Sequence, residues 1–200
     1  MKKLWMLWML VLPFCLSAQN HARAEEILDK TFEVLSDNSG IRVEFVGTDS
    51  GFLLLKGEKF YLNNSNIQCW YNGDTQWSYV AENKEVNISN PTPEELQGIN
   101  PYFILKNYKD NFHCTYQGNT GKKGAESHLL VLTSKHAGGN EIVRLTISNR
   151  YQPTELKIEQ NGQTLSHINI ISFRKNQHLE DNMFHFNKTL YPDIEVIDLR

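Results

Sequence analysis

The sequence lacks the motifs that most enzyme classes need. It contains no Gly-x-Ser-x-Gly elbow, no glycine-rich phosphate loop and no His-Glu-x-x-His pair. None of its seven histidines stands at metal-ligand spacing with a second strong ligand. His113 and Cys114 are adjacent, but neighbouring side chains of a strand point to opposite faces, so they make a weak metal pair. We therefore expect no catalytic residues, no cofactor and no metal centre.

Apolar runs long enough to cross a membrane are also missing. The longest, residues 4–16, follows Lys2 and Lys3 and is shorter than the roughly 20 residues that a spanning helix needs. A basic start followed by a short apolar run is typical of a secretory signal peptide, with cleavage after Ala18 or after Ala24. We favour Ala18, which predicts a signal peptide over residues 1–18 and a single exported, soluble domain over residues 19–200.

Positive charge and cysteine are both scarce. Lysine and arginine number 20 against 23 acidic residues, and loss of the signal peptide leaves a net charge of −5. This balance argues against nucleic-acid partners and against electrostatic docking on anionic lipid. Two cysteines remain after cleavage, Cys69 and Cys114. An oxidising compartment permits a disulfide between them, and the apolar setting of Cys69 equally suits a buried free thiol.

Strand patterns make up most of what is present. An amphipathic helix is predicted over residues 22–36, and from residue 41 onward apolar and polar residues alternate with a period of two. Asn72-Gly73 and Asn161-Gly162 predict tight hairpins. About eleven short strands at hairpin spacing predict an antiparallel meander. Such a sheet curls into a strongly curved, incomplete barrel, which limits its exposed edges.

One clearly helical stretch, residues 90–109, interrupts the strands. Thr92 and Glu95 have the spacing of a capping box, and Asn100 with Pro101 begins a second helix. The four apolar residues 102–105 cover more than one face of this helix, so they need a second apolar partner or a guest. The stretch is either a connection packed on the sheet or a lid over an apolar cavity.

A cavity inside the half-barrel would be walled by apolar side chains of the strands and of the helical stretch. The residues that we expect in these walls are Val43, Phe45, Trp70, Trp77, Tyr79, Val86, Ile88, Leu96, Ile99, Phe103, Leu105 and Tyr108. Each of them is equally compatible with an ordinary packed core.

Two local motifs and the order of the elements resemble a known family. The motifs are the aromatic hairpin at residues 71–79, Tyr-Asn-Gly-Asp-Thr-Gln-Trp-Ser-Tyr, and the helix entry at residues 90–96, Asn-Pro-Thr-Pro-Glu-Glu-Leu. Over nearly the whole exported chain the sequence is similar to the LolA-like family of periplasmic outer-membrane lipoprotein carriers, in its Bacteroidetes-type variant. The resemblance implies a periplasmic, monomeric half-barrel whose mouth is covered by helices.

The resemblance also implies a function without bond chemistry. A carrier of this family acts as a chaperone for lipoproteins: its apolar interior takes acyl chains released by an inner-membrane ABC-type complex and passes them to an outer-membrane acceptor. It uses no cofactor, binds no nucleic acid and does not insert stably into the membrane. The alternative within the same fold family is a module that senses lipids or lipoproteins without transporting them.

One turn departs from the family pattern. In the well-known carriers a Lys-Arg-Pro turn supplies an arginine that latches the helical lid. Here the corresponding turn reads Lys56-Gly57-Glu58-Lys59 and contains no arginine. Lys59 offers a point charge without the fork geometry of a guanidinium group. The latch is therefore not carried over to this chain.

Overall fold

The computed structural model describes residues 12–121, 126–136, 138 and 140–200, so the first eleven residues of the predicted signal peptide lie outside the description. The described helices and strands are, in chain order, α1 (Leu12–Leu35), β1 (Ile41–Gly47), β2 (Gly51–Lys56), β3 (Lys59–Asn64), β4 (Ile67–Tyr71), β5 (Gln76–Val80), β6 (Glu85–Ser89), α2 (Pro93–Ile99), α3 (Pro101–Lys106), α4 (Tyr108–Asn111), β7 (Phe112–Thr120), β8 (Ser127–Ser134), β9 (Glu141–Ser148), β10 (Pro153–Gln160), β11 (Gln163–Arg174), η2 (Asp181–Phe184), η3 (Lys188–Leu190) and β12 (Glu195–Asp198).

The strands form one curved sheet that does not close. Their order is β12-β6-β5-β4-β3-β2-β1-β11-β10-β9-β8-β7, so two meanders meet where β1 pairs with β11. All neighbours are antiparallel except β12, which runs parallel to β6. The predicted fold class, an incomplete antiparallel barrel with helices, is confirmed. The described part has twelve strands rather than about eleven, and the pair of β12 with β6 is parallel.

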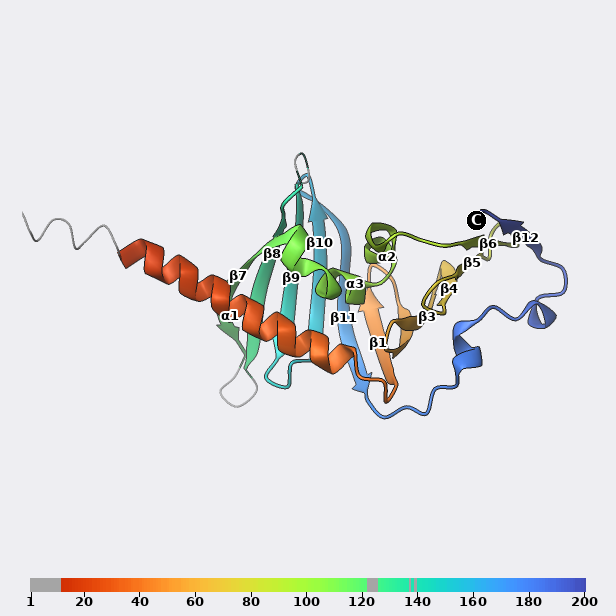
Figure 1. Ribbon diagram of the computed structural model, residues 1–200, viewed down its shortest axis with the longest axis horizontal. Helices are drawn as coiled ribbons and strands as arrows, with labels where there is room; N and C mark the ends of the chain where they lie inside the picture. Colours follow the sequence, from red (N-terminus) through yellow and green to blue (C-terminus); the bar gives the residue numbers. More distant parts are fainter. Residues whose placement is uncertain (1–11, 122–125, 137, 139) are drawn as a thin grey trace, which may run out of the picture.

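Helix α1 lies across the concave face of the sheet (Figure 1). It begins at Leu12, earlier than the predicted start at residue 22, and ends at Leu35, one residue before the predicted end. Its apolar stripe, which includes Ala24, Ile27 and Leu28, is fully buried. Helix α1 packs mainly on β7 and α3. None of the described helices is long and apolar enough to cross a membrane.

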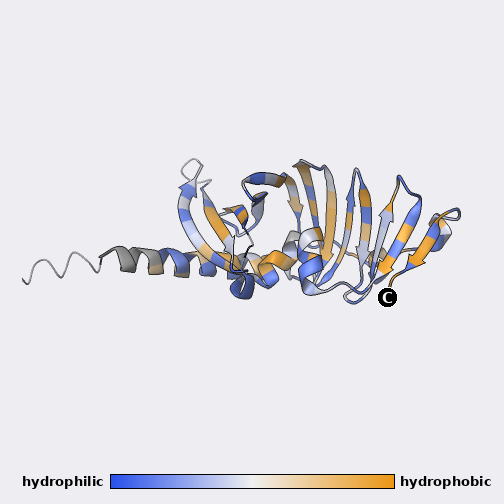
Figure 2. Cartoon of the chain, turned by 90° about the horizontal axis from the view of Figure 1, so that it is seen from above, coloured by the Kyte–Doolittle hydropathy of each residue, from blue (hydrophilic) through white to orange (hydrophobic). Residues whose placement is uncertain are grey.

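The predicted helical stretch forms α2, α3 and α4. The capping box is confirmed: Thr92 Oγ1 accepts from the Glu95 N–H at 3.3 Å, and Glu95 Oε2 accepts from the Thr92 N–H at 2.8 Å. These helices connect β6, near one end of the sheet, to β7 at the other end. They therefore cross the concave face, and seen from above the helices lie along one side of the strands (Figure 2).

After β11 the chain crosses to the convex face as a C-terminal strap, residues 175–194. The crossing requires a glycine at position 40, where φ is +82° and a Cβ atom would stand 2.0 Å from the carbonyl oxygen of Gln177. The Gln177 N–H donates to the Gly40 carbonyl at 3.0 Å. Figure 1 shows the strap running from the end of β11 to β12 at the far end of the sheet.

Aromatic packing and two ion pairs hold the strap on the sheet. The Trp70 ring contacts those of Phe186 and Tyr191, with ring centroids 5.5 and 6.1 Å apart. Asp181 accepts from Lys56 at 3.0 Å and from Lys59 at 2.7 Å. Lys59, the cation that this turn offers in place of the family arginine, thus contacts the strap through Asp181.

We predict that the Asp181 contacts stabilise the fold only while this carboxylate is charged. Hydrogen bonds from Lys59 and Lys56 lower the pKa of Asp181 from 3.8 to about 2. Because the folded-state pKa lies below the unfolded one, the stabilisation is complete above about pH 4 and is lost as the pH falls through 2. In urea unfolding from pH 6 to pH 2, Asp181→Asn should lower stability at pH 6 and flatten the decline below pH 4. The exposed control Asp193→Asn should follow the wild type, and identical curves for wild type and Asp181→Asn would contradict the prediction.

Candidate functional site

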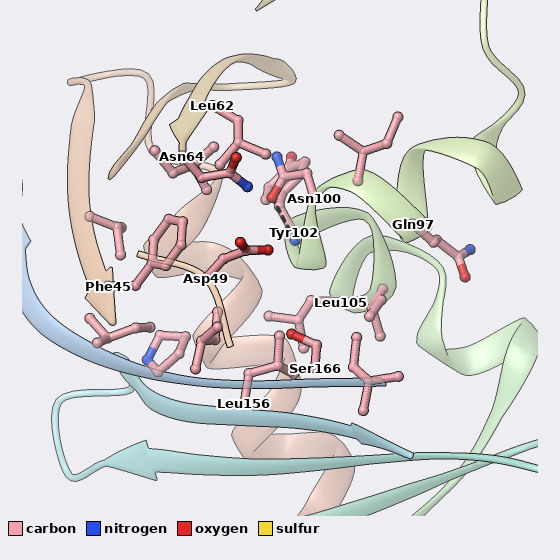
Figure 3. A pocket seen from close by; sticks show the side chains of 18 of the residues that line it. Phe45, Asp49, Leu62, Asn64, Gln97, Asn100, Tyr102, Leu105, Leu156 and Ser166 are labelled. Atoms are coloured by element: carbon pink, nitrogen blue, oxygen red, sulfur yellow. Dashed lines mark hydrogen bonds between the residues drawn. The ribbon is translucent and has the colours of Figure 1, made fainter. Parts of the chain in front are cut away.

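A cavity of about 410 Å³ lies between the concave face of the sheet and the helices (Figure 3). This volume is within the range of roughly 300–1,000 Å³ that small-molecule sites occupy. Its walls come from the end of α1, from β1–β4, from α2 and α3, and from β9–β11. Both meanders and the helical crossing therefore contribute, and the cavity exists only in the complete fold.

Strand register aligns the apolar walls. Val43 of β1 is the partner of Leu53 in β2, which in turn is the partner of Leu62 in β3. On the other side of β1, Phe45 is the partner of Ile170 in β11. Directly opposed residues of antiparallel strands share a face of the sheet. The alternation of the sequence thus becomes continuous apolar rows that face the cavity.

Polar side chains are few among the cavity residues. They are Thr48, Asp49, Asn64, Gln97, Asn100 and Ser166. Asp49 Oδ1 accepts from Asn66 Nδ2 at 2.9 Å, and Asn100 Oδ1 accepts from the Tyr102 N–H at 3.1 Å. Burial, with a smaller effect of the Glu58 charge, raises the pKa of Tyr102 to about 12, so its hydroxyl is neutral. Apolar walls with a few placed polar groups are typical of a site for a largely apolar ligand.

Four of the predicted wall residues line the cavity: Val43, Phe45, Ile99 and Leu105. Three others, Leu96, Phe103 and Tyr108, are buried in the packing between helices and sheet.

The Phe103 ring stands 6.1 Å from that of Phe60 and 5.9 Å from that of Tyr71, measured between centroids. A helix that is apolar on more than one face places one stripe toward the cavity and another against the sheet, and Leu105 and Phe103 belong to these two stripes.

The other five predicted wall residues lie on the convex face, outside this cavity: Trp70, Trp77, Tyr79, Val86 and Ile88. The tight turn at Asn72 pairs Tyr71 with Gln76 and Trp70 with Trp77. Tyr71 faces the helices, so its neighbour Trp70 and that residue's cross-strand partners face outward. Their aromatic surface packs beneath the C-terminal strap, a segment that no sequence pattern predicted.

Sequence reasoning missed most of the strand walls. The residues concerned are Leu53, Leu55, Leu62, Leu145, Leu156, Ile158, Ile168, Ile170 and Phe173. Their signal was present, because residues 52–55 of β2 are all apolar and apolar residues alternate with polar ones in β10 and in the middle of β11. Leu53 and Ile170 are in register with Val43 and Phe45. The prediction instead chose residues of β4, β5 and β6, because the aromatic hairpin has more apolar surface, and these residues lie on the convex face.

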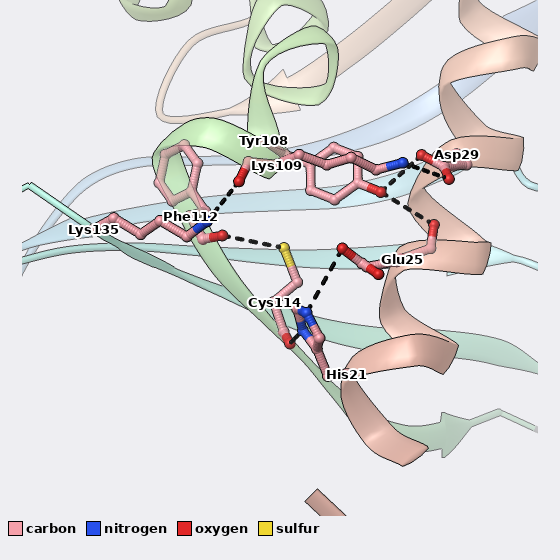
Figure 4. Close-up of polar contacts among 8 residues, drawn as sticks. All are labelled: His21, Glu25, Asp29, Tyr108, Lys109, Phe112, Cys114 and Lys135. Atoms are coloured by element: carbon pink, nitrogen blue, oxygen red, sulfur yellow. Dashed lines mark hydrogen bonds and ion pairs between the residues drawn. The ribbon is translucent and has the colours of Figure 1, made fainter. Parts of the chain in front are cut away.

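A polar cluster fastens the helices to one another and to β7 (Figure 4). The Tyr108 hydroxyl donates to Asp29 Oδ1 at 2.7 Å, and Lys109 pairs with the same carboxylate at 2.9 Å. Burial and the bond to Asp29 raise the pKa of Tyr108. His21 Nδ1 lies 3.0 Å from the carbonyl oxygen of Cys114. These contacts join α1 to α4 and to β7, which fixes one end of the helical crossing.

The disulfide left open by the sequence is not formed. Cys69 of β4 and Cys114 of β7 are both buried free thiols, on strands far apart in the sheet order. Burial raises the pKa of each to about 12, so neither is a thiolate at neutral pH. Within the described ranges no group of three or more His, Cys, Asp or Glu side chains is placed to hold a metal ion.

The β2–β3 turn contacts the helices through a different residue from the one the family pattern uses. Glu58 of this turn accepts from Lys106 Nζ at the end of α3. Here the turn supplies the carboxylate and the helix supplies the cation. In the family pattern the turn supplies the cation, an arginine. Both side chains are about one third to one half exposed, so the pair is a weak fastening.

A half-barrel with an apolar cavity under helices is the architecture of a binding protein for hydrophobic ligands. The sequence model of the family described as outer membrane lipoprotein carrier protein LolA matches residues 14–163. The chain belongs to this family, and the resemblance drawn from the two sequence motifs is confirmed. A comparison with curated proteins gave no match.

Comparison with solved structures shows the same fold in one of them, at low sequence identity, and lists weaker similarities in others. An uncharacterized conserved protein from Thermus thermophilus is 14% identical with a TM-score of 0.63, and the match covers 88% of this chain and 99% of that one. A putative outer membrane lipoprotein-sorting protein domain from Vibrio parahaemolyticus is 13% identical with a TM-score of 0.48, covering 86% and 99%. MucB is 11% identical with a TM-score of 0.48, covering 88% and 66%.

We predict that the inward face of β11 controls ligand binding and that its outward face does not. Ile170 lines the cavity, whereas its neighbour Ile171 is 63% exposed. Ile170→Glu places a charge among apolar walls and should weaken binding of a fluorescent acyl probe more than tenfold. The matched variant Ile171→Glu should bind as the wild type does. Equal losses in the two variants would contradict the placement of the cavity.

Proposed function

We propose that this protein is a periplasmic carrier that shields the acyl chains of lipoproteins between the inner and the outer membrane. The observation that carries the proposal is the cavity of about 410 Å³, walled by apolar residues of both meanders and roofed by α2 and α3. Membership of the lipoprotein carrier family supports it. The role is that of a chaperone and not of an enzyme, since shielding an acyl chain makes and breaks no covalent bond.

The energetics of acyl chains suit such a cavity. Exposing hydrocarbon to water costs about 0.8 kcal/mol per CH₂. Burying roughly eight methylenes therefore provides about 6 kcal/mol before the cost of association, so the tightest dissociation constant that this burial alone supports is of the order of tens of micromolar. An affinity of this order is sufficient to keep a chain out of water and still permits its release. The proposed donor is an inner-membrane ABC-type complex and the proposed recipient is an outer-membrane acceptor.

The test is a release assay. Purified protein is added to spheroplasts of its own source, and the soluble fraction is examined for acylated lipoproteins bound to it. We expect release by the wild type and at least a tenfold loss in Leu105→Asp, because Leu105 lines the cavity and is 4% exposed. Ile171→Glu serves as the charged surface control, and circular dichroism checks the sheet of each variant. Acyl binding without any release would reject transport and favour a lipid-sensing module of the same fold.

We further predict that the pair between Glu58 and Lys106 slows entry to the cavity. Glu58→Lys places two cations where an ion pair stood, so α3 should be held less firmly and an acyl probe should associate several-fold faster in stopped-flow fluorescence. Adding Lys106→Glu restores opposite charges and should restore the wild-type rate. An unchanged rate in Glu58→Lys would show that α3 does not gate the cavity.

A further inference from the structure

We propose that the cavity selects acyl chains joined through a neutral carbonyl, either an ester or an amide, and that Asn100 Nδ2 donates a hydrogen bond to that carbonyl oxygen. The proposal rests on the function proposed above and names the chemistry of its ligand. It depends on one buried amide group among the apolar walls of the cavity.

Asn100 stands between α2 and α3, lines the cavity and is 1% exposed. Its backbone N–H donates to the Leu96 carbonyl at 2.9 Å, and its own carbonyl accepts from the Phe103 N–H at 3.0 Å. Its side-chain oxygen accepts from the Tyr102 N–H at 3.1 Å. Only Nδ2 has no hydrogen-bond partner among the residues that the structure describes. A buried donor without a partner is costly, so a ligand acceptor at this point gains affinity by supplying one.

Helix capping does not account for this amide. Asn100 begins α3 through its side-chain oxygen, and serine or aspartate caps a helix about as well as asparagine does. The cap therefore explains the oxygen of the side chain and leaves the NH₂ group unexplained. An acyl carbonyl in the cavity explains it, because a carbonyl oxygen accepts from an amide donor and sits at the end of the chain that the apolar walls receive.

Gln97 is the rival donor. Its Nε2 is also buried and without a partner in the described part of the chain, and it too lines the cavity. Its side chain as a whole is only half-buried, and in Figure 3 its amide points away from Asn100 and the labelled wall residues. Asn100 is therefore the donor that depends on a ligand.

A carboxylate in the same cavity disfavours a negatively charged ligand and so favours a neutral one. Asp49 lines the cavity, and its Oδ1 is held by Asn66 Nδ2 at 2.9 Å. A free fatty acid would bring a second carboxylate among apolar walls, where like charges repel more strongly than in water. An ester or an amide carries no charge and avoids this repulsion. The site therefore suits acylated molecules better than free fatty acids.

The test measures displacement of a fluorescent acyl probe by three ligands that each have a twelve-carbon chain, counting the carbonyl carbon: methyl dodecanoate, dodecyl methyl ether and dodecanoate. We expect the ester to bind about tenfold more tightly than the ether, whose oxygen accepts hydrogen bonds less well. Asn100→Asp and Asn100→Ser both keep an acceptor for the Tyr102 N–H. The aspartate has no donor and should lose this preference, and the serine has only a shorter hydroxyl donor and should show a reduced preference. Asn187→Asp, at a helix N-cap outside the cavity whose side-chain oxygen likewise accepts from a backbone N–H, should retain it.

Two further arms examine charge and the source of the acyl group. Asp49→Asn should raise the affinity for dodecanoate several-fold and leave that for the ester unchanged, so the difference between the two ligands becomes smaller. An N-dodecanoyl, S-blocked cysteine amide represents an acylated lipoprotein, and dodecanoyl lysophosphatidylcholine represents a lipid. Weaker binding of either in Asn100→Ser supports the assignment, and the tighter of the two in the wild type identifies the source.

The outcomes separate this proposal from the function on which it rests. Equal binding of ester and ether by the wild type overturns the role of Asn100 and leaves an unselective acyl carrier. An unchanged preference in both Asn100 variants overturns it as well. Failure of all three ligands to displace the probe overturns the acyl-carrier function itself. The first comparison uses the unaltered protein, so it decides the question even where a variant does not fold.

Discussion

Strands β6 and β7 follow one another in the sequence, yet they lie toward opposite ends of the open sheet. The segment between them must cross the whole concave face, and by forming helices it satisfies most of its backbone groups within the segment itself. The roof of the cavity is therefore a consequence of the strand order. The apolar residues on more than one face of α3 follow from it too, since the helix packs between the sheet, α1 and the cavity.

The two faces of the sheet are covered by different parts of the chain, and β4 shows the result. Cys69, Trp70 and Tyr71 are all buried although they alternate between faces, because the helices cover one face and the C-terminal strap covers the other. The strap leads into β12, which extends the sheet beyond β6. The wall of the cavity is thus a sheet held from both sides, which suits a container whose shape must persist when it is empty.

The sequence predicted local features, such as helix caps and tight turns. It did not predict which side chains of a strand face the inside of the half-barrel and which face the outside. The capping box at Thr92 and the turn at Asn72 involve residues within a few positions of each other, so their spacing alone predicts them. Which face of the aromatic hairpin looks inward depends on Tyr71 meeting Phe103 and on Trp70 meeting Phe186, contacts between distant segments. The strap left no periodic signal, because irregularly spaced apolar residues and the ion pairs of Asp181 hold it in place. For the facing of the hairpin and the course of the strap, a sequence pattern can identify apolar residues but not the distant residues that they contact.

Wall and roof differ in how they are held. The strands of the wall share ladders of backbone hydrogen bonds, whereas α3 meets the β2–β3 turn through one exposed ion pair, a kind of contact worth about 0.2–1 kcal/mol. The opposite end of the crossing is fixed more firmly, since Tyr108 and Lys109 both bind Asp29 of α1. On the side where Asn100 stands, α3 is therefore held mainly by apolar packing, such as that of Phe103 on Phe60 and Tyr71. A ligand carbonyl bound there would bridge this part of the roof to cargo held by the wall, which links retention of the cargo to the position of the helices.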